Sequence, residues 1–231
     1  AGSSYRARWP LWASLVMSLS AIAALGHRHE RRLSVVLLSL ALLGIGFATA
    51  PPPHWRLIAL DVGHGDAVLI QGPRGQTALI DAGGHRRFPN RGRDQTRRRL
   101  LPALSQLGVG HLDLMVVTHG DLDHVGGADE VARRIPIREL WLSSCPQRRA
   151  VDSLARAVLA RKGRVFRVAS GPPLPWDDAT LQVLWPVKGE PCATTENDRS
   201  LVLKIGTPEG SALLMGDASH IVEGRLLGRE P

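Results

Sequence analysis

The sequence predicts an α/β sandwich, in which helices cover two facing β-sheets, preceded by a hairpin of two transmembrane helices. The sandwich is predicted because short aliphatic, β-branched strand patterns interleave with helix patterns after residue 55, and no segment is repeated. The hairpin is predicted by two uncharged stretches within the first fifty residues. We therefore expect a hairpin over 1–50, a linker over 51–55 and a sandwich domain over 56–231.

The two uncharged stretches, 9–25 and 33–50, flank a polar hexapeptide that begins at His27. Each is near the lower limit of about 17–25 residues for a helix that crosses a bilayer. A helix packed on a soluble core would show a polar stripe, and neither stretch has one. A buried two-helix appendage is the alternative. The arginines of the hexapeptide favour a cytoplasmic connector and an external downstream domain, whereas Arg6 and Arg8 favour the opposite orientation.

Three consecutive prolines at 51–53 cannot continue a helix and mark the start of the second part. In the order of the chain we expect strands 57–62, 67–71, 76–81 and 111–117, helix 128–134, strand 138–142, helix 151–161, strands 164–169, 181–185, 201–205 and 212–215, and a closing helix from Ser219. We expect loops over 171–176 and 186–198, where proline and other turn-forming residues are frequent.

A dense group of chemically active residues follows the strand at 111–117. Its members are His119, Asp121, Asp123 and His124, with Gly126 and Gly127 just after them. Two imidazoles and two carboxylates at one strand end compete for the same water, and a divalent cation relieves this conflict because it binds nitrogen and oxygen donors. A polar turn with surface histidines and helix-capping aspartates is the alternative. We interpret the group as a metal site.

Four other stretches place acidic residues beside predicted strands or turns. They are 60–67, 79–84, 196–203 and 213–218. Each alone is typical of a turn, but together with the His-x-Asp-x-Asp-His group, and in this order, they resemble the metallo-β-lactamase superfamily. More narrowly, the chain resembles the C-terminal domain of ComEC-type DNA-uptake competence proteins, in which a many-helix channel domain precedes a hydrolase-like domain. The resemblance implies an αββα sandwich.

The resemblance also implies a site for one or two divalent metal ions. One ion would be held by His119, Asp121 and Asp217, and the other by Asp123, His124 and Asp217, with Asp217 bridging. Two cations about 3.5–4 Å apart can activate a water molecule and bind both the attacking and the leaving oxygen of a phosphodiester. Asp121 stands where the superfamily usually has His, and a carboxylate shifts the preference from Zn²⁺ towards Mn²⁺.

Three further residues are assigned by the same resemblance. Asp198 or Asn197 would lie at the edge of the first metal, although Asn-Asp before a strand is also typical of a turn. Asp81 would orient the ligating groups, so we expect Asp81 and Asp123 to support catalysis. The superfamily's last metal-binding His lies beyond the bridging Asp, and only His220 follows Asp217 here, so we expect the domain to be incomplete at its C-terminus.

The segment from residue 85 to residue 99 is strongly basic, with Asp94 as its one acidic residue. Its arginines are Arg86, Arg87, Arg91, Arg93, Arg97, Arg98 and Arg99. Arginine binds phosphate bidentately, and several such contacts give affinity for nucleic acid that is independent of base sequence. A solvated surface is the alternative. The net charge of +8 also indicates an anionic partner, either nucleic acid or an anionic membrane surface.

Cys145 and Cys192 form no Cys-x-x-Cys motif and match no zinc-ribbon spacing. We interpret them as two buried free thiols, with a disulfide as the alternative for an exported domain.

The resemblance implies a metal-dependent phosphodiesterase or nuclease that is anchored in the inner membrane by several helices and cleaves the DNA strand that is not transported. Its partners would be DNA, the membrane and the rest of the channel domain, and the sandwich domain would lie on the periplasmic side. One alternative is a catalytically decayed domain that guides DNA or caps the channel, and another is a hydrolase of small thioesters or lactams.

Overall fold

The computed structural model describes residues 35–36, 38–40, 52, 54–85 and 89–228, and the chain divides into two compact units, 1–50 and 51–231. The first predicted transmembrane stretch lies outside the described residues. Of the second, only 35–36 and 38–40 are described, and they are helical. No helix within the described ranges is long and apolar enough to cross a membrane.

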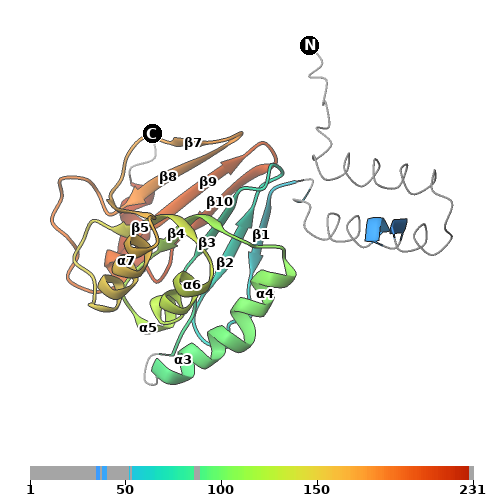
Figure 1. Ribbon diagram of the computed structural model, residues 1–231. Helices are drawn as coiled ribbons and strands as arrows, with labels where there is room; N and C mark the ends of the chain where they lie inside the picture. The colour runs from blue at the N-terminus through green and yellow to red at the C-terminus, as the bar shows by residue number, and fades with distance from the viewer. Residues whose placement is uncertain (1–34, 37, 41–51, 53, 86–88, 229–231) are drawn as a thin grey trace, which may run out of the picture. The chain divides into compact units, whose positions relative to one another are not determined.

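The second unit is built around two β-sheets (Figure 1). The larger sheet contains, in spatial order, β1 (Arg56–Ala59), β2 (Val68–Gln71), β3 (Thr77–Ile80), β4 (Leu112–Val117), β5 (Ile137–Ser143) and β6 (Arg164–Val168). Strands β1 to β3 form an antiparallel meander, and β3 to β6 are parallel. The carboxyl ends of four strands therefore meet at one edge of this sheet.

The smaller sheet is antiparallel, with the order β10–β9–β8–β7. Its strands are β7 (Leu174–Trp176), β8 (Ala179–Trp185), β9 (Val202–Thr207) and β10 (Gly210–Leu214). Strand β7 lies within the predicted loop 171–176, so that prediction was wrong in part. It tolerates Pro175 because an edge strand can lack one backbone donor.

Helices connect the parallel strands and cover the larger sheet (Figure 1). They are α3 (Pro89–Gln95), the π-helical turn η1 (Thr96–Leu100), α4 (Leu101–Gln106), α5 (Leu122–Val125), α6 (Ala128–Arg134) and α7 (Ala150–Ala160). The basic segment was not predicted to be helical, because its arginines hide the helical period until Leu100 and Leu104, which are fully buried. A 3₁₀ turn, η2 (Asn197–Arg199), and helix α8 (His220–Leu227) follow.

Three apolar clusters separate four layers. The first lies between the helices and the larger sheet and includes Met115, Leu140 and Leu154. The second lies between the sheets, where Val116 of β4 is grouped with Leu203 of β9. The third joins the outer face of the smaller sheet to α8. The order helix, sheet, sheet, helix is the predicted αββα sandwich, and β4 is apolar except for Asp113 because it is buried on both faces.

The two cysteines form a disulfide bond between Cys145 and Cys192, whose Cα atoms are 5.6 Å apart. The prediction of two free thiols was wrong. The bond joins the loop after β5 to the loop after β8 across 47 residues of sequence. Sequence spacing could not reveal it, because only the packing of the two sheets brings these loops together.

Candidate metal centre

Three side chains gather where the two sheets meet. His119 follows β4, His124 lies on α5 and Asp217 follows β10, and one donor atom of each lies within 4.8 Å of the other two. The Nε2 atom of His124 is 3.1 Å from Oδ1 of Asp217, and the Nε2 atom of His119 is 3.9 Å from Oδ2. Two imidazole nitrogens and one carboxylate form a donor set that suits a divalent cation.

The end of β10 reaches this position because Gly216 precedes Asp217. Gly216 has a φ of +55°, which favours glycine, and a Cβ atom there would lie 2.8 Å from the Cβ atom of Thr118. At the same place the backbone N–H of Leu201 donates to the carbonyl of Thr118 at 2.8 Å. These contacts bring the carboxyl ends of β4 and β10 together, although the two strands belong to different sheets.

Asp81 organises the centre from behind. Its Oδ1 accepts the backbone N–H of Thr118 at 2.8 Å, and its Oδ2 accepts the Thr118 hydroxyl at 2.6 Å and faces Nδ1 of His124 at 2.8 Å. With Nδ1 of His124 donating to Asp81, the Nε2 lone pair is the one left for a ligand. The Thr118 hydroxyl oxygen also lies 3.1 Å from Nδ1 of His119 and can accept a hydrogen bond from Nδ1–H, which leaves Nε2 of His119 as the ligating nitrogen.

The protonation of the two histidines fits a metal site. Burial and the charge of His124 lower the pKa of His119, so this imidazole is neutral and able to ligate at neutral pH. Its Nε2 atom is buried and has no hydrogen-bond partner. Burial alone would lower the pKa of His124, but its hydrogen bond to Asp81 and the nearby carboxylates raise it to about 9. The pocket therefore favours positive charge, which a bound cation can supply in place of the proton.

Asp121 and Asp123 are buried next to these residues but lie outside the three-residue group. Oδ1 of Asp121 forms an ion pair at 3.0 Å with Nε of Arg148. Asp123 lies on α5 against the loop at 63–65, where a Cβ atom on Gly65 would be 1.6 Å from the carbonyl oxygen of Asp123. This close approach requires glycine and places the 60–67 stretch directly beside the centre.

Asp198 lies outside the three-residue group, and both Asp198 and Asn197 make structural contacts, so their place at the edge of the first metal stays a prediction. The Asp198 carboxylate accepts the backbone N–H of Ser219 at 3.0 Å and the Thr195 hydroxyl at 2.8 Å, which orders the start of α8. Burial alone would raise the pKa of Asp198, but these hydrogen bonds hold it below its usual value. Asn197 begins η2, and its carbonyl accepts the N–H of Ser200 at 3.0 Å.

Two residues near the centre were missed by sequence reasoning. Arg148 pairs with Asp121, and Glu196 accepts the backbone N–H groups of Gly120 at 2.9 Å and of Arg148 at 3.3 Å. Both lie in the two loops that the disulfide joins. A correct prediction of the Cys145–Cys192 pairing could have indicated these two residues, because it would have placed their loops side by side.

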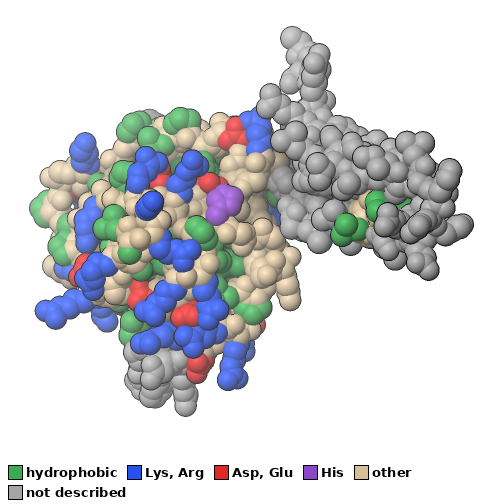
Figure 2. All heavy atoms as spheres, viewed as in Figure 1, with side chains coloured by type: hydrophobic (Ala, Val, Ile, Leu, Met, Phe, Trp, Pro, Cys, Tyr) green, Lys and Arg blue, Asp and Glu red, His purple; other side chains and the backbone are tan. Residues whose placement is uncertain are grey.

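The predicted DNA-binding arginines fall into three groups. Arg86 and Arg87 lie outside the described residues, as does the side chain of Arg91. Arg97 and Arg99 form ion pairs, at 2.9 Å with Glu130 and at 2.8 Å with Asp61. The remaining two are Arg93 and Arg98, and like Arg97 and Arg99 they are exposed. Figure 2 shows many Lys and Arg side chains on one face of the described surface.

Comparison with known proteins supports the same reading of the fold and motifs. Residues 60–230 match the Metallo-beta-lactamase superfamily. The chain is 29% identical over 168 residues to ComE operon protein 3 of Bacillus subtilis, covering 68% of this chain and 21% of that protein. It is 30% identical over 172 residues to Recombination protein 2 of Haemophilus influenzae, covering 74% of this chain and 19% of that protein. The chain thus spans about a fifth of the length of these curated relatives.

Among solved structures, the chain is similar to the metallo-beta-lactamase fold protein YhfI of Bacillus subtilis, with 10% identity and a TM-score of 0.44 over 66% of this chain and 54% of that one. It is also similar to CmlA, a diiron beta-hydroxylase of Streptomyces venezuelae, with 18% identity and a TM-score of 0.44 over 90% of this chain and 36% of that one.

Proposed function

The chain belongs to the metallo-beta-lactamase superfamily, as a domain of the ComEC type, and we propose that it is a metal-dependent phosphodiesterase that cleaves DNA during uptake. The observation that carries this proposal is the convergence of His119, His124 and Asp217 from three separate elements, with the Nε2 atom of His119 buried and without a hydrogen-bond partner. A buried imidazole nitrogen without a partner is costly unless a ligand occupies the site.

We assign metal binding to His119, His124 and Asp217, with Asp121 and Asp123 as additional carboxylates beside them. A bound Mn²⁺ or Zn²⁺ ion would act as a Lewis acid towards water and towards the phosphodiester oxygens. Asp81 holds the imidazole of His124, and Thr118 holds that of His119. The chain's own contribution is therefore a set of donors whose orientation is already established by hydrogen bonds.

DNA is the proposed substrate because the centre lies on a basic molecule whose relatives are of the ComEC type. The exposed arginines Arg93, Arg97, Arg98 and Arg99 are candidates for phosphate contacts, and a carboxylate orients Arg97 and another orients Arg99. Contacts of this kind give affinity that falls as the salt concentration rises. We also propose that the domain works together with the rest of the channel domain, and that the strand it does not cleave is the one that the channel transports.

We propose that residues 9–25 and 33–50 anchor this domain in the inner membrane, with the sandwich on the periplasmic side. The disulfide between Cys145 and Cys192 supports this placement. Disulfide bonds persist in oxidising compartments such as the periplasm and are rare in the cytosol.

The test compares the 231-residue chain with His124→Ala and Asp217→Asn variants, and His220→Ala is the matched control outside the three-residue group. We expect the parent chain and the control to bind Mn²⁺ in calorimetry and to cleave single-stranded DNA in the presence of Mn²⁺. Both centre variants should lose metal binding and cleavage together. Cleavage by the Asp217→Asn variant at the rate of the parent chain would refute the proposal.

The alternative function is a DNA-guiding or structural cap of the channel whose centre no longer binds metal. The ion pair between Arg148 and Asp121 favours this alternative, because it engages a carboxylate that would ligate the first metal ion in a two-metal site. Calorimetry separates the two functions, since fewer than one Mn²⁺ ion per chain together with retained DNA affinity would support the cap.

A further inference from the structure

A cavity lies at the opposite edge of the larger sheet. It has a volume of about 710 Å³ and opens where β4, β5 and β6 begin, between the β2–β3 turn and strand β7. Strand β4 runs from this cavity to the metal centre, and its six residues span about 20 Å. The cavity is therefore separate from the metal centre, and its volume is within the range of about 300–1,000 Å³ that small-molecule sites occupy.

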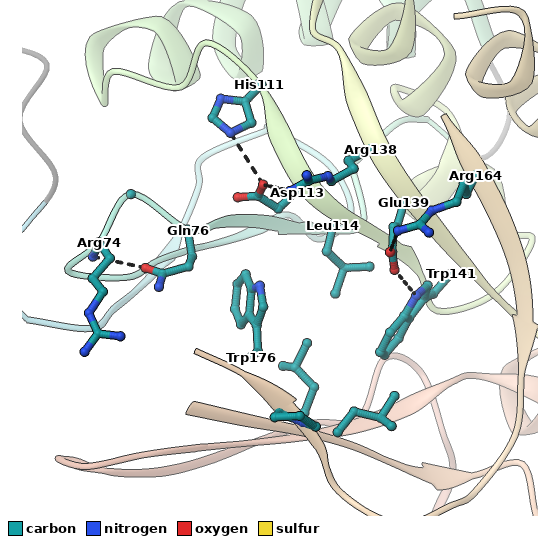
Figure 3. A pocket seen from close by; sticks show the side chains of 14 residues that line it. Arg74, Gln76, His111, Asp113, Leu114, Arg138, Glu139, Trp141, Arg164 and Trp176 are labelled. Carbon is teal, nitrogen blue, oxygen red and sulfur yellow. Dashed lines mark hydrogen bonds and ion pairs between the residues drawn. The ribbon is translucent and has the colours of Figure 1, made fainter. Parts of the chain in front are cut away.

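The inner wall of the cavity is aromatic and aliphatic. Trp141 of β5 and Trp176 of β7 face it from different sheets, with Leu114 of β4 nearby (Figure 3). Trp141 is 7% exposed, and its Nε1 donates to Glu139 at 3.2 Å, so the indole is held in place. Trp176 is supported from behind by Trp55, with ring centroids 5.2 Å apart. Indole rings fixed in this way suit a flat aromatic ligand.

The rim of the cavity carries guanidinium groups. Arg74, Arg138 and Arg164 line it, with side chains 62%, 73% and 63% exposed. Each forms an ion pair with one carboxylate, from Asp177, Asp113 and Glu139 respectively. A guanidinium has five N–H donors, so one such pair orients the group and leaves other donors for a phosphate.

We propose that this cavity binds a nucleotide, with its base against the partly exposed indole of Trp176 and its phosphate at the arginine rim. An inorganic anion would leave the indoles unused, and a purely apolar ligand would cover the guanidinium groups without satisfying them. Stacking on an aromatic side chain tolerates any base, which fits a site that takes either a free nucleotide or one unit of a single strand. This proposal is independent of the metal centre.

The test is calorimetric titration of the 231-residue chain in EDTA, which prevents metal-dependent cleavage. The titrants are thymidine monophosphate, thymidine, inorganic phosphate and a thymidine hexanucleotide. We expect the monophosphate to bind at one site and at least about tenfold more tightly than thymidine or phosphate alone, because only it makes both kinds of contact. A hexanucleotide affinity above that of the monophosphate assigns the site to a strand, and an equal or lower one assigns it to free nucleotides.

Arg138→Ala and Trp176→Leu should each weaken binding of the monophosphate by about tenfold. Arg156→Ala, on the exposed face of α7, is the matched control and should leave binding unchanged. Trp176→Phe retains an aromatic face and should preserve most of the affinity for the monophosphate. This variant also tests the role of position 176 if Trp176→Leu does not fold. Unchanged binding in Arg138→Ala and in a folded variant at Trp176, or phosphate binding as tight as that of the monophosphate, would overturn the proposal.

Discussion

The disulfide between Cys145 and Cys192 allows a quantitative prediction about both stability and the metal centre. The two cysteines are separated by 47 positions in the sequence, and the loop that the bond closes contains β6, β7 and β8. A cross-link lowers the entropy of the unfolded chain, and for a loop of this length the stabilisation is about 4 kcal/mol. We therefore expect reduction to lower the free energy of unfolding of the chain by about 4 kcal/mol.

The assay is urea denaturation of the chain with and without reductant, followed by circular dichroism. The control is the double variant Cys145→Ala with Cys192→Ala, whose unfolding should not respond to reductant and should resemble that of the reduced parent chain. Alanine is chosen because Cys145 is 1% exposed and a serine hydroxyl would be buried there. A parent chain with the same unfolding midpoint in both conditions would show that the disulfide does not stabilise the fold.

The disulfide should also matter at the metal centre, because the loops that it joins carry Arg148 and Glu196. Glu196 accepts the N–H of Gly120, the residue between His119 and Asp121. Reduction is therefore expected to lower Mn²⁺ affinity in the chain while it remains folded. Calorimetry at urea concentrations below the unfolding transition measures this effect. An Mn²⁺ affinity that does not depend on reductant would show that the loop contacts do not influence metal binding.

Three other predictions concern single side chains. The hydrogen bond from Arg97 outweighs the effect of burial and lowers the pKa of Glu130 from 4.5 to about 2. Glu130→Gln should therefore lower the free energy of unfolding by about 1–3 kcal/mol at pH 7, as measured by urea denaturation. This difference should persist above about pH 4.5 and vanish as the pH falls towards 2; a constant difference down to pH 2 would contradict the ion pair. Asp81→Asn should weaken Mn²⁺ binding about 10- to 100-fold in calorimetry, since it loosens His124, and unchanged affinity would contradict that role. Arg148→Ala should raise Mn²⁺ affinity about two- to fivefold, because the largely exposed guanidinium of Arg148 competes only weakly with a cation for Asp121. Arg149→Ala is the control, and lower affinity in Arg148→Ala would argue against competition.

Much of the fold could be predicted from local patterns. The strand at Leu112–Val117 is apolar except for Asp113, and the helix at Ala128–Arg134 has the predicted bounds. The basic helical segment was not recognised, because the period of a helix is visible only where apolar residues mark its buried face. The short strand Leu174–Trp176 was missed because its pairing with β8, and not its composition, makes it a strand.

The dense group from His119 to His124 could be recognised from its spacing in the sequence, whereas the acidic residues beside other strand ends, Asp217 among them, were assigned through the resemblance to a known family. Which of these residues meet depends on the tertiary structure. Asp217 reaches the histidines because Gly216 allows β10 to approach Thr118, while Asp198 is used to order α8. Likewise, the cysteine pairing and the cavity with two indoles depend on how the two sheets pack. Contacts between residues so distant in the chain follow from the packing of layers, and a local pattern carries no record of that packing.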